Sequence, residues 1–145
     1  MTDNIRPMRP EDKPILMEMM RTFYASPAVH SNGSEEIFSN DIDACLGDTP
    51  YLEGYIIASG NTIQGYSMVA KSFATEFGKH CIWIEDLYIR EQYRNTGLGP
   101  EFLEFITQKY PGCVFRLEVE EENEHAVNVY KKQGFTFLPY KEMVK

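Results

Sequence analysis

The spacing of apolar and polar residues changes near position 50 of the chain. Before that point, apolar residues recur every three or four positions, which is typical of helices that pack by one face. After it, short apolar runs rich in Tyr, Ile and Val alternate with turns and with further helical stretches. This change of period predicts one sheet flanked by helices.

The chain is expected to begin with a short strand and a helix. The strand covers residues 4–8, and Pro7 places it at a sheet edge, because proline has no N–H to donate to a neighbour. Asp12 is expected to cap the helix and Pro14 suits its first turn. The apolar stripe of this helix consists of Ile15, Leu16, Met19, Met20 and Phe23.

A loop, a second helix and a hairpin are expected next. Residues 26–33 are the loop, and the helix runs from Ser34, which caps it, to about Leu46. Residues 52–58 and 62–71 then form a hairpin around a Gly-Asn turn.

The C-terminal half alternates strands and helices. Residues 81–89 carry apolar side chains on both faces, which is typical of a central strand. The other expected elements are a loop over 73–79, a helix over 100–110, a strand over 113–119, a helix over 123–133 and closing strands over 135–138 and 141–144. This order predicts the α/β class, with a mixed sheet flanked by helices in a single domain over residues 1–145.

Composition narrows the possible partners. The 145 residues carry 22 Asp plus Glu against 14 Lys plus Arg, a formal net charge of -8. Such a surface repels phosphate backbones, so nucleic acid is not an expected partner. It attracts a cationic small molecule or a basic peptide, although the same charge also serves solubility alone.

The sequence contains no pattern that predicts a membrane helix, export or a metal site. No apolar run reaches the roughly 18 residues of a membrane helix, and the first residues lack an apolar signal core. Cys45, Cys81 and Cys113 lie too far apart in sequence to indicate a disulfide framework or a zinc site. We therefore expect reduced thiols, no metal and a cytoplasmic location.

The strongest local signal lies in Arg94-Asn95-Thr96-Gly97-Leu98-Gly99, between a strand and a helix. Glycines there allow a tight turn and close approach of a ligand. The free N–H groups and the dipole of the following helix favour an anion at the same place. Main-chain binding of a phosphate or pyrophosphate is therefore predicted, with added charge from Arg94.

These glycines also fit a simpler role. A plain strand-to-helix turn would use glycines for packing alone, and short motifs often arise by chance. A P-loop is excluded, because the segment ends in Gly99-Pro100-Glu101 and not in Gly-Lys-Ser/Thr. A dinucleotide fingerprint is excluded, because position 102 is Phe.

Two linked motifs decide between a ligand-binding turn and a plain one. The first is Arg94-x-x-Gly97-x-Gly99 after an apolar strand, and the second follows the next strand. The second motif consists of Asn123, Ala126, Tyr130 and Gly134-Phe135. Together they resemble the acyl-coenzyme-A signature of the GNAT superfamily of N-acetyltransferases, over about residues 81–135. One departure is Pro100, which removes one possible N–H donor to phosphate.

The resemblance implies a coenzyme A-binding set. The pantetheine arm would lie along the strand at Leu87, Tyr88 and Ile89, with the Leu87 N–H as donor to the thioester oxygen. Asn123 would contact the same arm, although an Asn there also suits a helix cap. Tyr130 matches the general acid that protonates the thiolate, and its alternative is packing of the last helix.

The general base is less well determined. Glu85 and Asp86 are adjacent, so on a regular strand their side chains point to opposite faces unless a bulge intervenes. Glu85-Asp86-Leu87 resembles family members that acetylate polyamines, where Glu85 would be the base. It would otherwise orient substrate or pair with an Arg, and Glu118 and Glu120 are reserve candidates.

The resulting hypothesis is a transferase that moves the acetyl group of acetyl-CoA to a primary amine by direct transfer in a ternary complex. The acceptor would be a cationic small molecule, similar to a polyamine or aminoglycoside. Two alternatives stay open: acetylation of a protein or peptide, and a non-catalytic acyl-CoA-binding sensor. Family resemblance also allows a homodimer.

Overall fold

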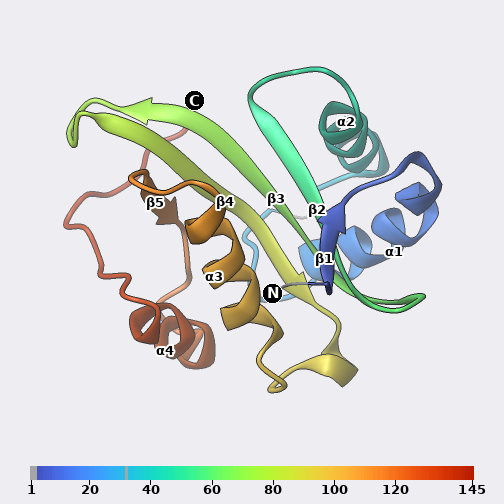
Figure 1. The fold of residues 1–145 in the computed structure, drawn as a ribbon. Coiled ribbons are helices and arrows are strands. Elements are labelled where there is room, and N and C mark those ends of the chain that lie inside the picture. The colour runs from blue at the N-terminus through green and yellow to red at the C-terminus, as the bar shows by residue number, and fades with distance from the viewer. Residues whose placement is uncertain (1–2, 32) are drawn as a thin grey trace.

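The computed structural model describes residues 3–31 and 33–145. Residues 1, 2 and 32, which belong to the predicted single domain and to the predicted loop over 26–33, lie outside the described residues. The sheet contains β1 (Ile5–Pro7), β2 (Leu52–Ser59), β3 (Thr62–Ala74), β4 (Lys79–Ile89) and β5 (Val114–Leu117), in that spatial order (Figure 1). Neighbours are antiparallel except for β4 and β5, which are parallel, so the predicted mixed sheet is confirmed.

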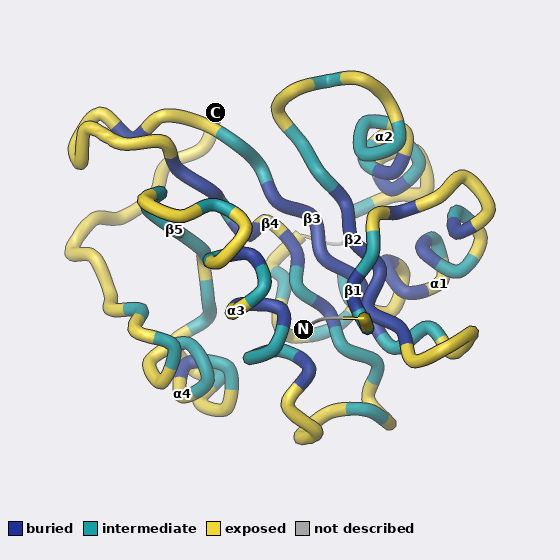
Figure 2. The backbone as a smooth tube through the Cα atoms, viewed as in Figure 1, coloured by how far each residue is buried: buried dark blue, intermediate teal, exposed yellow. Residues whose placement is uncertain are grey.

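Helices cover both faces of this sheet. One core packs β2, β3 and β4 against α1 (Lys13–Tyr24) and α2 (Glu35–Leu46). The other packs alternate residues of the same strands against α3 (Leu98–Lys109) and α4 (Glu124–Lys132) (Figure 1). Buried positions follow the strands and the inner sides of the helices, and the loops are exposed (Figure 2). Alternating side chains along each strand supply the two cores.

Several predicted boundaries move. The β3–β4 hairpin extends through Phe73 and back from Lys79, so only its tip is the predicted loop. Helix α3 begins at Leu98, two residues before the expected start. Single turns of 3₁₀ helix precede α1 at Pro10–Asp12 and follow β4 at Glu91–Tyr93.

The predicted closing strands are wrong. Residues 135–145 form no ladder within the described chain, and they run outside β5 in Figure 1. Pro139 directly follows the first predicted strand and has no N–H with which to extend a ladder. Met143 and Val144 remain 94% and 96% exposed, so burial of their side chains does not offset the cost of ordering them.

Two predicted helix caps in the N-terminal half differ in outcome. Ser34 caps α2, because its Oγ accepts the Ile37 N–H at 3.2 Å. Asp12 instead lies buried and accepts two hydrogen bonds from the Arg6 guanidinium, at 2.8 and 3.0 Å, and one from the Arg9 N–H at 2.7 Å. Asp12 therefore connects β1 to the start of α1.

None of the helices in residues 3–31 and 33–145 combines the length and the apolar character that crossing a membrane requires.

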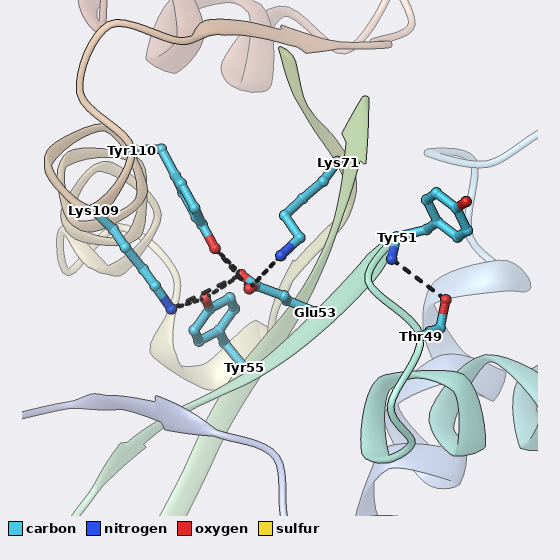
Figure 3. Close-up of polar contacts among 7 residues, drawn as sticks. All are labelled: Thr49, Tyr51, Glu53, Tyr55, Lys71, Lys109 and Tyr110. Carbon is cyan, nitrogen blue, oxygen red and sulfur yellow. Dashed lines mark hydrogen bonds and ion pairs between the residues drawn. The ribbon is translucent and has the colours of Figure 1, made fainter. Parts of the chain in front are cut away.

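A polar network joins the end of α3 to the sheet (Figure 3). The Glu53 carboxylate accepts hydrogen bonds from Tyr55 Oη at 2.7 Å, Tyr110 Oη at 2.6 Å and Lys71 Nζ at 3.1 Å. Lys109 Nζ donates to Tyr55 Oη at 2.6 Å. Burial alone would raise the pKa of Glu53, but these hydrogen bonds and the Lys109 charge lower it.

We predict that Glu53→Gln lowers the free energy of unfolding by about 1–2 kcal/mol at pH 7, because it leaves charged and hydroxyl donors without an ionised acceptor. The folded-state pKa is lowered, so the carboxylate stabilises the fold above its unfolded pKa of about 4.3. This stabilisation is lost as the pH falls through the folded-state pKa. Urea unfolding at pH 7 and below about pH 4 should show the difference from wild type shrinking.

The control is Glu104→Gln, on the exposed side of α3, expected to change stability by less than about 0.5 kcal/mol. Equal effects of the two substitutions at pH 7 would contradict the prediction.

Candidate active site

A β-bulge in β4 sets the geometry of the site. Met68 of β3 pairs with Asp86, and the next residue, Val69, pairs with Ile84. Glu85 is therefore an extra residue on β4. Glu85 and Asp86 line the same cavity on the face covered by α1 and α2, so the bulge that would let both carboxylates share a face is present.

Asp86 is buried beneath two tyrosines. Its carboxylate accepts hydrogen bonds from Tyr24 Oη at 2.9 Å and Tyr66 Oη at 2.6 Å. Burial raises the pKa of Asp86, and the two hydroxyl donors oppose that shift. With both oxygens engaged, Asp86 is held in place by its neighbours.

Glu85 differs from Asp86 although the two are adjacent. Within the described residues, its carboxylate has no hydrogen-bond or ion-pair partner, and it lines the cavity. Desolvation by the surrounding protein raises its pKa, and the charges of Asp86, Glu142 and Asp41 add to this effect. Of the two adjacent carboxylates, Glu85 is therefore the one whose oxygens no described neighbour engages.

Asp41 of α2 completes an acidic pocket with these two residues. The pocket has a volume of about 210 Å³, and its described lining contains no Lys, Arg or His. Burial and the charge of Asp86 raise the pKa of Asp41. Three carboxylates around one small pocket favour a cationic ligand.

The sequence did not single out Asp41, Tyr24 or Tyr66. Asp41 and Tyr24 lie beside the apolar stripes of their helices in the sequence. This position indicates that they are near the core but not which strand they contact.

The strands β4 and β5 separate at the bulge. Their pairing runs from Cys81 and Val114 to Ile84 and Leu117, and β4 then continues to Ile89 without a described neighbour on that side. The Arg90 N–H donates to Gln64 of β3 at 2.8 Å, whereas the Ile89 carbonyl accepts from Arg94. Since main-chain groups alternate along a strand, those of Leu87 and Ile89 point toward the open side.

Tyr88 lies between these two residues and behaves differently. Its ring is buried in the core beneath α1, at 5.3 Å from Phe23 and 6.0 Å from Tyr66, measured between ring centroids. Its predicted contact with coenzyme A stays a prediction.

The segment 94–99 forms a tight turn into α3. Arg94 Nε donates to the Ile89 carbonyl at 2.9 Å, and its guanidinium lies over the Tyr88 ring. Asn95 has φ 63° and Gly97 φ 90°, both in the left-handed region. Thr96 Oγ1 donates to the Tyr93 carbonyl at 2.6 Å, which closes the turn.

The N-terminus of α3 is open to a ligand. No described side chain caps it, and a Cβ built on Gly97 or Gly99 would meet no atom within 4 Å. The Leu98 and Gly99 N–H groups are first-turn donors, which Pro100 is not. This arrangement fits an anion such as the phosphates of coenzyme A.

Tyr130 and Asn123 lie at α4. Asn123 caps the helix by accepting the Ala126 N–H at 3.3 Å, so the predicted cap is present. Tyr130 packs edge-on against Phe135 at 5.9 Å between ring centroids, and burial raises its pKa. It lines a larger cavity of about 1060 Å³ that Glu85 also lines, so the structure brings the predicted acid and base to one space.

The two reserve carboxylates, Glu118 and Glu120, have different surroundings. Glu118 is exposed and lines the larger cavity. The Glu120 carboxylate contacts Nε2 of the exposed His30, and this contact joins the loop after α1 to the segment before α4.

Comparisons with known proteins identify the family of the chain. The sequence model of the acetyltransferase (GNAT) family matches residues 15–135. The chain belongs to this family. GNAT acetyltransferases use acetyl-CoA as a co-substrate, which agrees with the open N-terminus of α3. Within the described residues, no group of three or more His, Cys, Asp or Glu side chains is arranged to hold a metal ion.

Two similar acetyltransferases illustrate the match. The thialysine N-epsilon-acetyltransferase of Mus musculus is 32% identical over 80 residues, covering 53% of this chain and 46% of that protein. The spermine/spermidine N(1)-acetyltransferase of Bacillus subtilis (strain 168) is 32% identical over 60 residues, covering 39% of this chain and 40% of that protein. The chain thus spans about half the length, or less, of these relatives.

The fold also matches solved structures. A possible acetyltransferase from Clostridium difficile 630 superimposes with a TM-score of 0.80 at 16% identity, covering 97% of this chain and 95% of that one. At this identity, the likeness supports the GNAT fold alone.

We predict opposite effects on stability for the two glycines of the turn. Gly97→Ala should lower the free energy of unfolding by about 1 kcal/mol, because alanine is strained at positive φ. Gly99 lies inside α3 with open space around it, so Gly99→Ala should be neutral or stabilising by about 0.5 kcal/mol. Urea unfolding without co-substrate measures both, and a similar loss for both variants would be inconsistent with this turn geometry.

Proposed function

We propose that this protein transfers the acetyl group of acetyl-CoA to the amine of a cationic small molecule. The observation that carries the proposal is the position of Glu85, which lines both the acidic pocket and the larger cavity containing Tyr130. A base between an amine-binding pocket and an acid is the arrangement that direct transfer requires. A cytoplasmic location is part of the same proposal.

The co-substrate would be held by main-chain groups. The turn from Arg94 to Gly99 and the first N–H groups of α3 would bind the phosphates, and the helix dipole would favour their charge. The main-chain groups of Leu87 and the Ile89 N–H, on the open side of β4, would bind the pantetheine arm as an added strand. Asn123, while capping α4, would be a further donor to this arm. Acetyl-CoA supplies an activated thioester.

The acceptor would enter the acidic pocket as a cation. Asp41 and Asp86 provide negative charge, and the residues described along the pocket include no basic one that would neutralise it. Relatives named for acting on thialysine and on spermine or spermidine are consistent with an amine acceptor. The pocket of about 210 Å³ suits an aminoalkyl arm better than a bulky group.

Each catalytic step is assigned to one group of the chain. Glu85 accepts the proton of the incoming ammonium, a role that its raised pKa supports. The Leu87 N–H donates to the oxygen on which negative charge develops. Tyr130 gives its phenolic proton to the departing sulfur, and its raised pKa keeps it protonated beforehand. Transfer is then direct, in a ternary complex.

Calorimetry followed by a thiol-release assay tests this function. Acetyl-CoA should bind the purified protein, and thiol should be released with small cationic amines but not with neutral or acidic ones. Release with peptides alone would point to a peptide acceptor. Binding without release from any acceptor would favour a sensor, and absence of binding would overturn the proposal.

Glu85→Gln should lower kcat/KM about 100-fold or more, because the variant cannot accept the ammonium proton. In wild type, activity should fall as the pH drops through the pKa of Glu85, which lies above the ordinary glutamate value of about 4.3. This acidic limb should be absent from the variant. The matched control is Glu118→Gln, which should retain activity within about threefold; a large loss in that variant instead would assign the base to Glu118.

A further inference from the structure

Arg116 occupies an unusual position in the larger cavity. It lies on β5 opposite Trp83 of β4, and its guanidinium carbon is 4.8 Å from the Trp83 ring centroid and 5.9 Å from that of Phe77. Its Nε is buried and has no hydrogen-bond partner among residues 3–31 and 33–145. The described residues also provide no ion pair for this guanidinium. Arg116 is therefore held beside two aromatic rings with donors unused.

Three of the other arginines in this acidic chain have carboxylate partners, whereas Arg94 donates to the Ile89 carbonyl. Arg6 pairs with Asp12, Arg21 with Glu35, and Arg90 with Glu18. A buried donor without an acceptor is costly, so such groups usually mark the place of an ordered water or a ligand. A guanidinium beside aromatic rings is weakly hydrated and presents its N–H groups in a plane that matches a carboxylate.

The position of Arg116 relates it to the acceptor pocket. Arg116 and Glu85 line the same cavity. Trp83, which contacts the guanidinium, precedes Glu85 by two residues, which is about 7 Å along a strand. Trp83 pairs with Ala70, which lines the acidic pocket. A group able to bind an anion and the proposed base thus line the same cavity, about two residues apart along the strand direction.

The surrounding charges restrict where an anion can bind. Glu85, Glu118 and Glu142 all line this cavity and repel a carboxylate. Lys131 and Lys141 are the other basic residues of the described lining, and Lys131 lies over the Phe137 ring. Arg116 is the basic residue of the lining that lies on the sheet itself, next to Trp83.

We propose that Arg116 binds the carboxylate of the acceptor, so that the acceptor is a cationic diamino acid about as long as lysine. Its distal amine lies at Glu85 and the acidic pocket, and its carboxylate accepts hydrogen bonds from the guanidinium. This inference rests on the proposed function. It narrows the acceptor class from cationic amines in general to amines that carry a carboxylate at the far end.

The test compares lysine with cadaverine, which has the same carbon chain and amine without the carboxylate. With acetyl-CoA and wild-type protein, thiol release should show a kcat/KM for lysine at least about tenfold above that for cadaverine. Arg116→Met, which keeps apolar contact with Trp83, should lower the lysine value about 10- to 100-fold and leave the cadaverine value within about twofold. Arg116→Lys should restore part of the lysine activity.

Two measurements distinguish carboxylate binding from a structural role of Arg116. Acetyl-CoA affinity and urea unfolding should be unchanged in Arg116→Met, and equal losses for lysine and cadaverine would mean a structural role and overturn the inference. If wild type releases no thiol with any amine, the proposed function fails. Calorimetric binding of lysine and cadaverine to wild type and to Arg116→Met then decides the inference. Weaker binding of lysine alone to the variant supports it, and equal binding of lysine to both proteins overturns it.

Discussion

The one extra residue in β4 is the feature on which the site depends. A regular ladder would place Glu85 and Asp86 on opposite faces of the sheet. The bulge brings both to the face of α1 and α2, where Asp41 also lies. Bulges bend the strand that carries them, and the pairing of β4 with β5 ends at Ile84, directly before the bulge. The same irregularity therefore accompanies both the acidic pocket and the open edge of β4.

Burial and charge within the pocket explain how neighbouring carboxylates differ. Asp86 is buried, but two tyrosine hydroxyls donate to it and favour its ionised form. Burial raises the pKa of Glu85 and of Asp41, and the negative charge of Asp86 adds to both shifts. A cationic acceptor would oppose both shifts, since an opposite charge favours ionisation. In the proposed reaction, acceptor binding and proton transfer would therefore be coupled through Coulombic interactions. The two tyrosines hold Asp86, whose charge contributes to both shifts.

The sequence predicted the elements more reliably than their contacts. The strand over 81–89, the helix caps at Ser34 and Asn123, and the turn at Arg94–Gly99 depend on local propensity, and the structure contains all of them. The bulge depends on the register of β3 against β4. The residues at the bulge are Glu85 and Asp86, and neither is a glycine that would indicate a bulge in the sequence. The meeting of Asp41 with Asp86 depends on the packing of α2 over the sheet. Such contacts join residues far apart in sequence, where periodicity alone carries no information.

In the C-terminal segment, a local pattern predicted a strand that the structure does not contain. Residues 135–138 alternate like a strand, yet a strand is stable only when its main-chain groups find a partner and one face is buried. Arg116 illustrates the converse case. In sequence it is one charged residue within a short apolar run, which predicts only an exposed position on a strand. Its relation to Trp83 and to Glu85 follows from the parallel register of β5 with β4, so the chemistry of this residue becomes visible only once the sheet is assembled.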